Sequence, residues 1–564
     1  MGSPAPKAVE RAPPVIFPWR RGYDRATLPA DAIAGLTAAA VVLPKAMAYA
    51  TVAGLPVQVG LYAACAPPIV YAALGRSAVL SVSTTTTIGI LVGSALSGPL
   101  PHADPARLAT AAATLSVMVG VVLLAAAALR FGFLANFISE PVLVGFKAGV
   151  GAVIIADQIP KLLGFHIQKV DFFRDLLSIG RAAGGASLPT LLLSAAMVAT
   201  LLATRRWLPR VPAALLAVGV GIGASTLLDL PSLGVETIGT IPSGLPSVVR
   251  PDLGLLGALW PAALAIALMS FTETIASGRA FGSHAQPRPA ANVELVATGL
   301  GNVLGGLLGA MPSGGGTSQT LVNKRAGART QLAGLVLGLA ALATLLLLAP
   351  VMSLMPEAAL AAIVVVYSAE LLSVIDFRAI AAIRRTELFW ALTACAGVLL
   401  LGTLHGILVA VIASLLSLAY QAAHPRVYEV ARRPGTNVFR GRTGEHPGDE
   451  TYPGLLMTRV EGRIFFVNAQ HVLDLLAPLV HAADPKVIVL DCSAILDLEY
   501  SALKMLGEAE ERVRGHGATL WLAALNPEPR RVVERSPLGK ALGHERMFFD
   551  LEHAVTHYLA RGGA

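Results

Sequence analysis

Two polar segments interrupt the apolar stretches of this chain, at residues 81–96 and 310–323. The first reads SVSTTTTIGILVGSAL and the second reads AMPSGGGTSQTLVN. Backbone that is not helical at membrane depth is tolerated only where it lines protein or water. A half-helix that starts there directs its unpaired N–H groups toward the bilayer midplane. Paired interruptions of this kind indicate a substrate site in transporters built from repeats.

The two interruptions predict an anion site made of two facing helix N-termini. Partial positive charge and hydroxyl groups at these ends suit a small anion. In the other interpretation, the hydroxyls only satisfy backbone groups within packed helices and the glycines allow close helix contact. That interpretation does not explain why the two interruptions occupy matching positions in the two halves of the membrane region. The predicted binding residues are Ser83, Thr84, Thr85, Gly315, Gly316, Thr317, Ser318 and Gln319.

Two charged residues lie inside apolar runs. Glu273 stands in PAALAIALMSFTETIASG, where an unpaired carboxylate costs several kcal/mol, so it pairs, faces water, binds a proton or holds neighbouring helices together. Ser277 follows one helical turn later on the same face. Lys45, in AAAVVLPKAMAYATVAG, either serves the site or extends its ammonium to the membrane interface. We expect Lys45 and Glu273 to reach one crevice and to form an ion pair when it is empty.

The elements that position these residues are membrane helices. Of the 564 residues, 55% are hydrophobic and 14% are charged, a balance typical of membrane proteins. Twelve apolar runs and the two interrupted segments together make fourteen segments. Each interruption is the third segment in its half of the chain, which predicts seven helices repeated twice. Apolar runs of spanning or near-spanning length begin near Ala32, Pro56, Leu108, Pro141, Leu188, Pro212, Leu256, Val293, Gln331, Pro356, Leu388 and Ile407.

The net charge of +8 does not indicate nucleic acid, because the cations gather at the ends of the apolar runs. That pattern places both termini in the cytoplasm, and we predict a multi-pass protein of the inner membrane with no cleaved signal peptide. Cys65, Cys395 and Cys492 lie far apart in the sequence, so we expect no disulfide, metal site or cofactor. The sequence shows no nucleophilic side chain matched with a general base, so nothing in it suggests an enzyme.

The C-terminal part reads as a soluble α/β domain with a mainly buried sheet. We expect strands in LLMTRVEG, RIFFVNA, KVIVLDCS and TLWLAAL, and helices over 469–483 and 501–517. The predicted divisions are an N-terminal cytoplasmic segment at 1–30, a membrane domain at 31–423 with repeats at about 31–230 and 256–423, and the soluble domain with its connection at 424–564.

Several long motifs resemble the sulfate permease family. They are DAIAGLTAAAVVLPKAMAYATVAGLPVQVGLYAACAPPIVYAALG, FTETIASGRAFGSHAQPRPAANVELVATGLGNVLGG and PSGGGTSQTLVNKRAGARTQLAGL, and in the tail KVIVLDCSAILDLEYSALKML, which is similar to the STAS domain of that family. The resemblance implies a polytopic α-helical membrane protein with the uracil-permease-like fold. Its fourteen spanning segments form two inverted seven-helix repeats, a core domain moves against a gate domain, and two chains form a homodimer in membrane lipid.

The resemblance also implies roles for single residues. Glu273, with Ser277, would bind the coupling ion, and a Glu at this position favours a proton over sodium. Lys45 stands where many members have Gln, Gln319 where many have Arg, and Ser83 with Thr84 where a Gly-Pro pair is usual. Ser501 matches a serine that is phosphorylated in related anti-sigma factor antagonists, so it is a candidate regulatory site, and a cytoplasmic protein partner would bind at the STAS domain.

The predicted function is therefore secondary transport of a small inorganic or carboxylate anion, such as sulfate, bicarbonate or a dicarboxylate, in symport with protons. Three alternatives remain open at this point. They are sodium-coupled bicarbonate uptake, nucleobase uptake, which related carriers perform without a STAS domain, and an anion-responsive channel or sensor.

Overall fold

The chain forms two compact units, Met1–Leu415 and Leu416–Ala564. The computed structural model describes residues 16–20, 23–100, 103–136, 139–167, 171–208, 211–281 and 290–562. Most of the predicted N-terminal segment at 1–30 lies outside the described residues, including residues 1–15. The two units are treated separately below.

Every predicted apolar run coincides with a helix that begins in the first unit, and the last of these helices continues past Leu415. Such helices satisfy all their backbone groups internally, as hydrocarbon requires. The first half holds α1 (Leu28–Val52), α2 (Val57–Leu74), α3 (Thr86–Ser97), α4 (Pro105–Ala128), α5 (Glu140–Leu163), α7 (Leu188–Trp207) and α8 (Ala213–Leu227). The second half holds α9 (Leu256–Phe281), α10 (Ala291–Leu307), α11 (Thr317–Arg325), α12 (Leu332–Ala343), α13 (Ala349–Met352), α14 (Glu357–Ser368), α16 (Arg385–Leu401) and α17 (Thr403–Ala423).

Nine spans among the described residues are long and apolar enough to cross a membrane. One of them joins α12 and α13 through a π-helical turn at Thr344–Leu348. The five other predicted segments form shorter helices, α3, α8, α10, α11 and α16. One additional helix, α6 (Phe172–Ala182), lies between predicted segments, while α15 (Val374–Ile383) follows α14 within the span Glu357–Ile383.

The two interruptions meet in space. Strand β1 (Val82–Ser83) pairs antiparallel with β2 (Gly314–Gly315), with Val82 opposite Gly315. Helix α3 begins just after β1 and α11 just after β2. Glycine is required in β2, because a Cβ on Gly315 would lie 2.7 Å from the Thr274 Cα of α9. The sequence predicted the two half-helices but not the strand pair that joins them.

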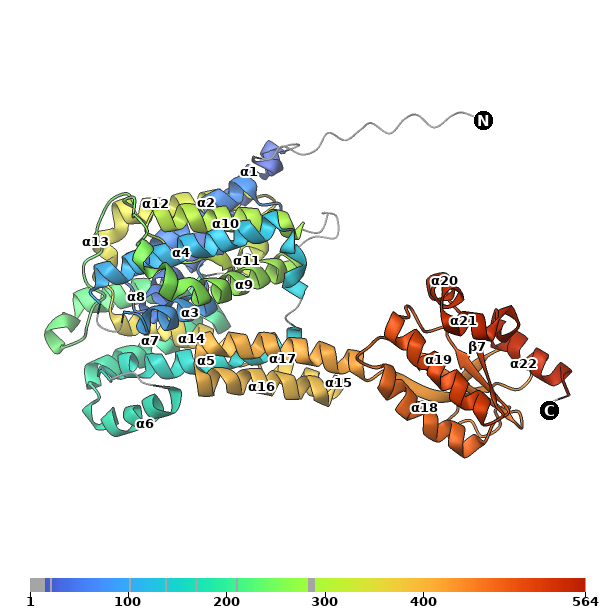
Figure 1. The fold of residues 1–564 in the computed structure, drawn as a ribbon. Helices are drawn as coiled ribbons and strands as arrows, with labels where there is room; N and C mark the ends of the chain where they lie inside the picture. The colour runs from blue at the N-terminus through green and yellow to red at the C-terminus, as the bar shows by residue number, and fades with distance from the viewer. Residues whose placement is uncertain are drawn as a thin grey trace, which may run out of the picture. The chain divides into compact units, whose positions relative to one another are not determined.

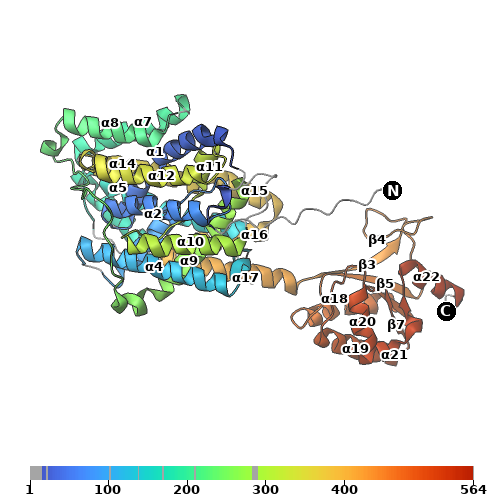
Figure 2. The ribbon, with the colours of Figure 1, turned by 90° about the horizontal axis from the view of Figure 1, so that it is seen from above.

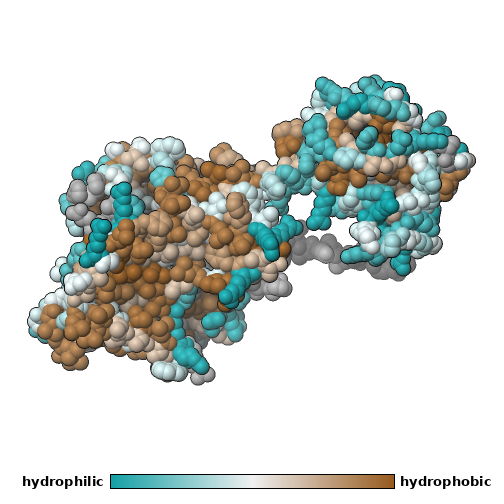
Figure 3. Space-filling model, turned by 90° about the horizontal axis from the view of Figure 1, so that it is seen from below, coloured by the Kyte–Doolittle hydropathy of each residue, from teal (hydrophilic) through white to brown (hydrophobic). Residues whose placement is uncertain are grey.

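The helices of the first unit pack as two bundles (Figures 1 and 2). In the first bundle, α4 packs on α10 and α9, and α1 packs on α2, α11 and α12. In the second bundle, α5 packs on α16 and α14, and α7 packs on α14 and α8. The bundles meet where α1 contacts α14 and α8, and where α3 contacts α5. Large apolar side chains such as Leu192, Leu202 and Leu400 are exposed on the outer helices, and Figure 3 shows a broad hydrophobic surface over this unit.

The second unit is an α/β domain. Its six-stranded sheet has the order β4-β3-β5-β6-β7-β8, with β5 to β8 parallel and β3 antiparallel to both of its neighbours. The strands are β3 (Arg426–Arg432), β4 (Phe439–Gly441), β5 (Leu455–Glu461), β6 (Val487–Asp491), β7 (Thr519–Ala523) and β8 (Met547–Phe548). The helices are α18 (Ala469–Ala483), α19 (Tyr500–Gly515), α20 (Pro527–Arg535), α21 (Pro537–Leu542) and α22 (Leu551–Ala560).

One predicted strand of this domain is wrong. RIFFVNA, residues 463–469, forms a turn that leads into α18 rather than a strand. The Asn468 side chain closes the turn, because its oxygen accepts from the Phe465 N–H at 3.0 Å and its amide donates to the Arg463 carbonyl at 2.9 Å. Phe466 is 71% exposed. Local side-chain hydrogen bonding outweighed the apolar character of the segment.

Candidate functional site

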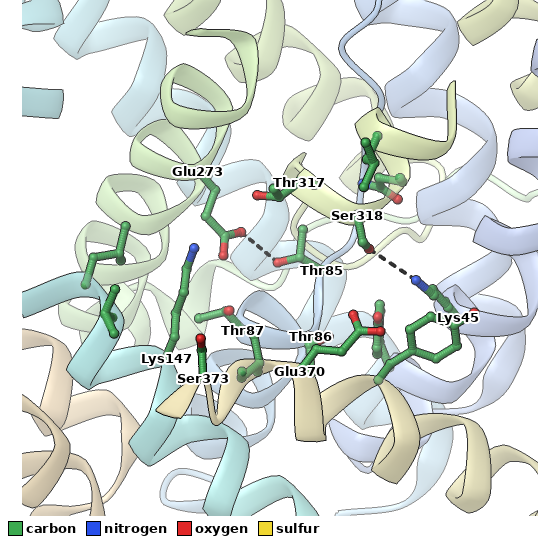
Figure 4. A pocket seen from close by; sticks show the side chains of 18 of the residues that line it. Lys45, Thr85, Thr86, Thr87, Lys147, Glu273, Thr317, Ser318, Glu370 and Ser373 are labelled. Atoms are coloured by element: carbon green, nitrogen blue, oxygen red, sulfur yellow. Dashed lines mark hydrogen bonds between the residues drawn. The ribbon is translucent and has the colours of Figure 1, made fainter. Parts of the chain in front are cut away.

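A cavity of about 440 Å³ lies between the two bundles. The first bundle lines it with residues of α1, α3, α9 and α11, and the second bundle with residues of α5, α14, the 3-10 turn Ala369–Leu371 and α15. Eight of the predicted site residues line the cavity: Lys45, Thr84, Thr85, Glu273, Gly316, Thr317, Ser318 and Gln319. Figure 4 shows several of these side chains gathered around one space.

The N-termini of α3 and α11 both open on this cavity. Helix α3 begins at Thr86, and the hydroxyl of Thr85 caps it by accepting from the Ile88 N–H at 3.3 Å. Helix α11 begins at Thr317 after Gly316, which provides no side-chain cap. The first backbone N–H groups of a helix lack partners within it, so both ends present donors and partial positive charge to the cavity.

Lys45 supplies a full positive charge to the same space. It lies inside the 25-residue helix α1 and is only 3% exposed. Its Nζ donates to the Ser318 Oγ at 3.1 Å and lies 3.5 Å from the centroid of the Tyr367 ring. Lys45 therefore joins α1, the start of α11 and a residue of the second bundle.

Glu273 lies on the opposite side of the cavity from Lys45 (Figure 4). Its side chain is buried, and its Oε2 accepts from the Thr85 hydroxyl at 2.8 Å. The expected ion pair between Lys45 and Glu273 is therefore wrong for this structure, because each residue is bound to a different half-helix. The side chain of Lys147 on α5 extends toward Glu273 instead (Figure 4).

Three predicted site residues lie behind the cavity rather than in its lining. Ser83 is in β1 and Gly315 in β2. The Ser277 hydroxyl contacts the Gly315 carbonyl at 3.2 Å and the Thr317 hydroxyl at 3.0 Å. Ser277 and Gly315 hold the start of α11 against α9.

Sequence reasoning missed most of the wall that the second bundle contributes. Glu140, the first residue of α5, and Lys147, about two turns later on the same helix, both line the cavity. Their lone charges beside the apolar run PVLVGF were the available signal. Thr86, Thr87 and Leu321 also line the cavity, and they lie within the two interrupted segments although they were not among the predicted binding residues. Nothing local distinguishes the remaining lining residues, which are Tyr49, Leu143, Val144, Tyr367, Glu370, Leu371, Ser373 and Asp376.

The cavity has the chemistry of an ion-binding site. Its donors are helix N-termini, hydroxyls and two lysines, and its carboxylates are Glu140, Glu273, Glu370 and Asp376. Glu370 is paired with Arg205 at 2.7 Å. No group of three or more His, Cys, Asp or Glu side chains in the described ranges is placed to hold a metal ion.

Ser501 is the second residue of α19 in the α/β domain, and it is exposed. The preceding Glu499 is paired with Arg463 at 2.6 Å. The serine hydroxyl therefore stands at the start of a helix, a position where an added phosphate is favourable.

Comparison with known families identifies the two units. The profile of the sulfate permease family matches residues 28–396, and the profile of the STAS domain matches residues 446–554. The chain belongs to the sulfate permease family. Members of this family are transporters, so this sulfate permease homologue is a membrane transporter and not an enzyme, as predicted.

Curated relatives match this chain over nearly its full length. A probable sulfate transporter of Mycobacterium tuberculosis H37Rv is 33% identical over 96% of this chain and 97% of its own length. Sulfate transporter 1.3 of Arabidopsis thaliana is 28% identical over 96% of this chain and 87% of its own length.

Solved structures show the same fold. The murine Slc26a9 anion transporter, in an inward-facing state, has a TM-score of 0.87 at 20% identity, with 96% of this chain and 93% of that chain covered. The transmembrane domain of the cyanobacterial bicarbonate transporter BicA has a TM-score of 0.60 at 24% identity, covering 70% of this chain and 98% of that one. These likenesses confirm the predicted multi-pass helical membrane domain followed by a STAS domain.

Proposed function

We propose that this protein is a secondary transporter of a small anion, in symport with protons. The observation that carries the proposal is the meeting of two helix N-termini and Lys45 in one cavity between two bundles. Sulfate is the first substrate to test, because curated relatives that match most of this chain are named sulfate transporters. Bicarbonate and small dicarboxylates suit the same donors.

The donors around the cavity support an anion as the substrate. Backbone N–H groups at the starts of α3 and α11, with the hydroxyls of Thr317 and Ser318, can replace the hydration shell of an oxyanion. The Lys45 ammonium adds Coulomb attraction that grows with the charge of the anion. The hydroxyl of Thr84 lines the cavity, is buried, and has no partner among the described residues.

Glu273 supports a proton as the coupling ion. Its carboxylate bonds to Thr85, which caps one of the two helices that would bind the anion. An ionised Glu273 and an anion bound on the other side of Thr85 repel each other, whereas a protonated Glu273 does not repel the anion. An anion therefore binds best with a proton on Glu273, which links the two in one transported complex.

The position of the cavity supports transport by relative movement of the bundles. The first bundle corresponds to the core domain and carries Glu273 and both half-helices, while the second corresponds to the gate domain and closes the cavity with α5, α14 and α15. A rigid-body movement of the core past the gate would expose the bound anion to one side and then the other. We further propose that gate domains form a homodimer in the inner membrane, with both termini cytoplasmic and the STAS domain, including Ser501, regulating assembly and rate.

Uptake by reconstituted protein tests the proposal. Purified full-length protein in liposomes is expected to accumulate radiolabelled sulfate saturably under an imposed outside-acid gradient, and a protonophore is expected to abolish the accumulation. A sodium gradient alone should drive none. Accumulation driven by sodium would overturn the proposed coupling. Failure to transport sulfate, bicarbonate or a dicarboxylate above the level of empty liposomes would overturn the proposed substrate class, and uracil uptake would favour the nucleobase alternative.

A further inference from the structure

Tyr367 lies where the two bundles meet and contacts two cations. Lys45 of the core domain has its Nζ 3.5 Å from the centroid of the Tyr367 ring. Arg205 of the gate domain has its Cζ 4.1 Å from the same centroid. The face of an aromatic ring attracts cations through its quadrupole. The ring of Tyr367 is therefore a gate-domain group in direct contact with the Lys45 ammonium.

The gate domain fixes this ring through charged neighbours. The Arg205 guanidinium from α7 packs on the ring and donates from Nη1 to the Glu370 carboxylate at 2.7 Å. Tyr367 and Glu370 lie one turn apart, at the end of α14 and in the following 3-10 turn. Three segments of the gate domain thus hold the ring at a defined place in the cavity wall (Figure 4 shows Glu370 beside Lys45).

Lys45 needs such a support to act on an anion. A lysine carries a point charge on a flexible four-carbon chain, and ordering that chain costs conformational entropy. The only hydrogen bond that its ammonium makes among the described residues is to Ser318, at the start of α11. The ring restricts the side chain from the other side, so that the ammonium already points at the N-terminus of α11 before an anion arrives. Binding to an ordered group costs less than binding to a mobile one.

We propose that Tyr367 is a positioning residue of the anion site, whose ring holds the Lys45 ammonium beside Ser318 and so raises affinity, most of all for divalent anions. The inference rests on the proposed function. It adds a contribution of the gate domain to affinity, because α1 and α14 belong to different bundles. Movement of the core away from the gate separates Lys45 from the ring and weakens the site, which favours release of the anion.

Calorimetric titration of purified full-length protein with sulfate and with chloride tests the proposal. Tyr367→Leu removes the ring and is expected to weaken sulfate binding roughly tenfold and chloride binding roughly threefold, because the lost Coulomb attraction scales with anion charge. Tyr367→Phe keeps the ring and is expected to retain both affinities within about twofold. Size-exclusion chromatography and thermal melting check that each variant is folded. Tyr367→Met, which is flexible and fills space well, replaces the leucine variant if the latter is unfolded.

The same substitutions in a Lys45→Gln background separate positioning from a general effect on structure. Without the ammonium, Tyr367→Leu is expected to change sulfate affinity by less than about twofold, because coupled residues are non-additive. An equal loss with and without Lys45, an equal loss for both anions, or no loss at all would overturn the proposal. Wild-type protein that binds neither anion would instead contradict the proposed function, so the two failures are distinguishable.

Discussion

At the scale of single residues, the core domain buries two opposite charges and holds each with a hydroxyl from a different half-helix. Ser318 of α11 accepts from Lys45, and Thr85 at the start of α3 donates to Glu273. The two charges are therefore kept apart across the cavity, and an anion placed between the helix ends meets both. Because Lys45 attracts an anion and an ionised Glu273 repels it, we expect the protonation of Glu273 to decide whether the anion binds.

Glu273→Gln is expected to abolish proton-driven accumulation of sulfate. The amide keeps a hydrogen bond to Thr85 and resembles the protonated acid, so anion binding and anion exchange should persist while net proton-coupled uptake is lost. Radiolabelled uptake into liposomes with and without a pH gradient measures this, and counterflow measures exchange.

Glu357→Gln is the matched control. Glu357 lies outside the cavity lining and is paired with Lys161 at 3.7 Å, so its replacement should leave the dependence on the gradient unchanged. Wild-type gradient dependence in Glu273→Gln would show that another group carries the proton.

At the scale of elements, the strand pair β1–β2 sets the positions of the two half-helices. Each strand is two residues long, and β2 is made of Gly314 and Gly315. The Gly315 N–H donates to the Thr274 hydroxyl of α9 at 2.9 Å. Helix α11 can therefore start at the cavity only because a backbone without side chains packs directly on α9.

Gly315→Ala is expected to weaken sulfate binding at least tenfold. The new Cβ would lie 2.7 Å from the Thr274 Cα, so β2 and the start of α11 must shift, and overpacking of this kind costs about 1–3 kcal/mol. Gly257→Ala, on the same helix α9, is the control because a Cβ there meets nothing within 4 Å. Calorimetric titration should show loss for the first variant only, and native affinity in Gly315→Ala would mean that the strand pair does not position the site.

The edge strand β4 of the STAS domain offers a pH-dependent test. Arg440 donates to both carboxylate oxygens of Asp449 at 2.8 Å, and these hydrogen bonds hold the pKa of Asp449 below its ordinary value of 3.8. A carboxyl with a lowered folded pKa adds stability above its unfolded value and loses that contribution as pH falls through the folded value.

Asp449→Asn should therefore increase hydrogen exchange in β3 and β4 relative to wild type at pH 6. The difference should begin to shrink as pH falls below about 3.8 and should disappear only below the lower folded pKa, where the wild-type carboxyl is also neutral. Exchange followed by mass spectrometry at both pH values measures this. A difference between the two proteins that stays constant with pH would show that the ion pair is not its source.

At the scale of the whole molecule, the membrane unit contains the complete cavity. All of its lining residues lie before Leu415, where the first compact unit ends. The STAS domain has its own sheet and two apolar cores, one on each side of that sheet. We therefore expect anion binding and its regulation to be carried by parts of the chain with separate cores.

A chain that ends after His424 is expected to bind sulfate with near-native affinity and to transport it more slowly. It retains all the described membrane helices and both half-helices, while it loses cytoplasmic contacts that we expect to support the dimer. Calorimetric titration and liposome uptake on the purified truncated protein measure the two properties. A folded truncated protein without sulfate binding would show that the STAS domain contributes to the site.

The sequence by itself determined the membrane helices, the two interrupted segments and the residues at their ends, including Lys45 and Glu273. These follow from local constraints, since a bilayer sets the length of an apolar run and requires internal hydrogen bonds along it. Only the tertiary structure decided that β1 pairs with β2, that Lys45 contacts Tyr367 rather than Glu273, and that Lys147 and Glu370 complete the cavity. Such contacts join segments up to some 320 residues apart, and they depend on how all the helices pack together, which no local pattern of residues encodes.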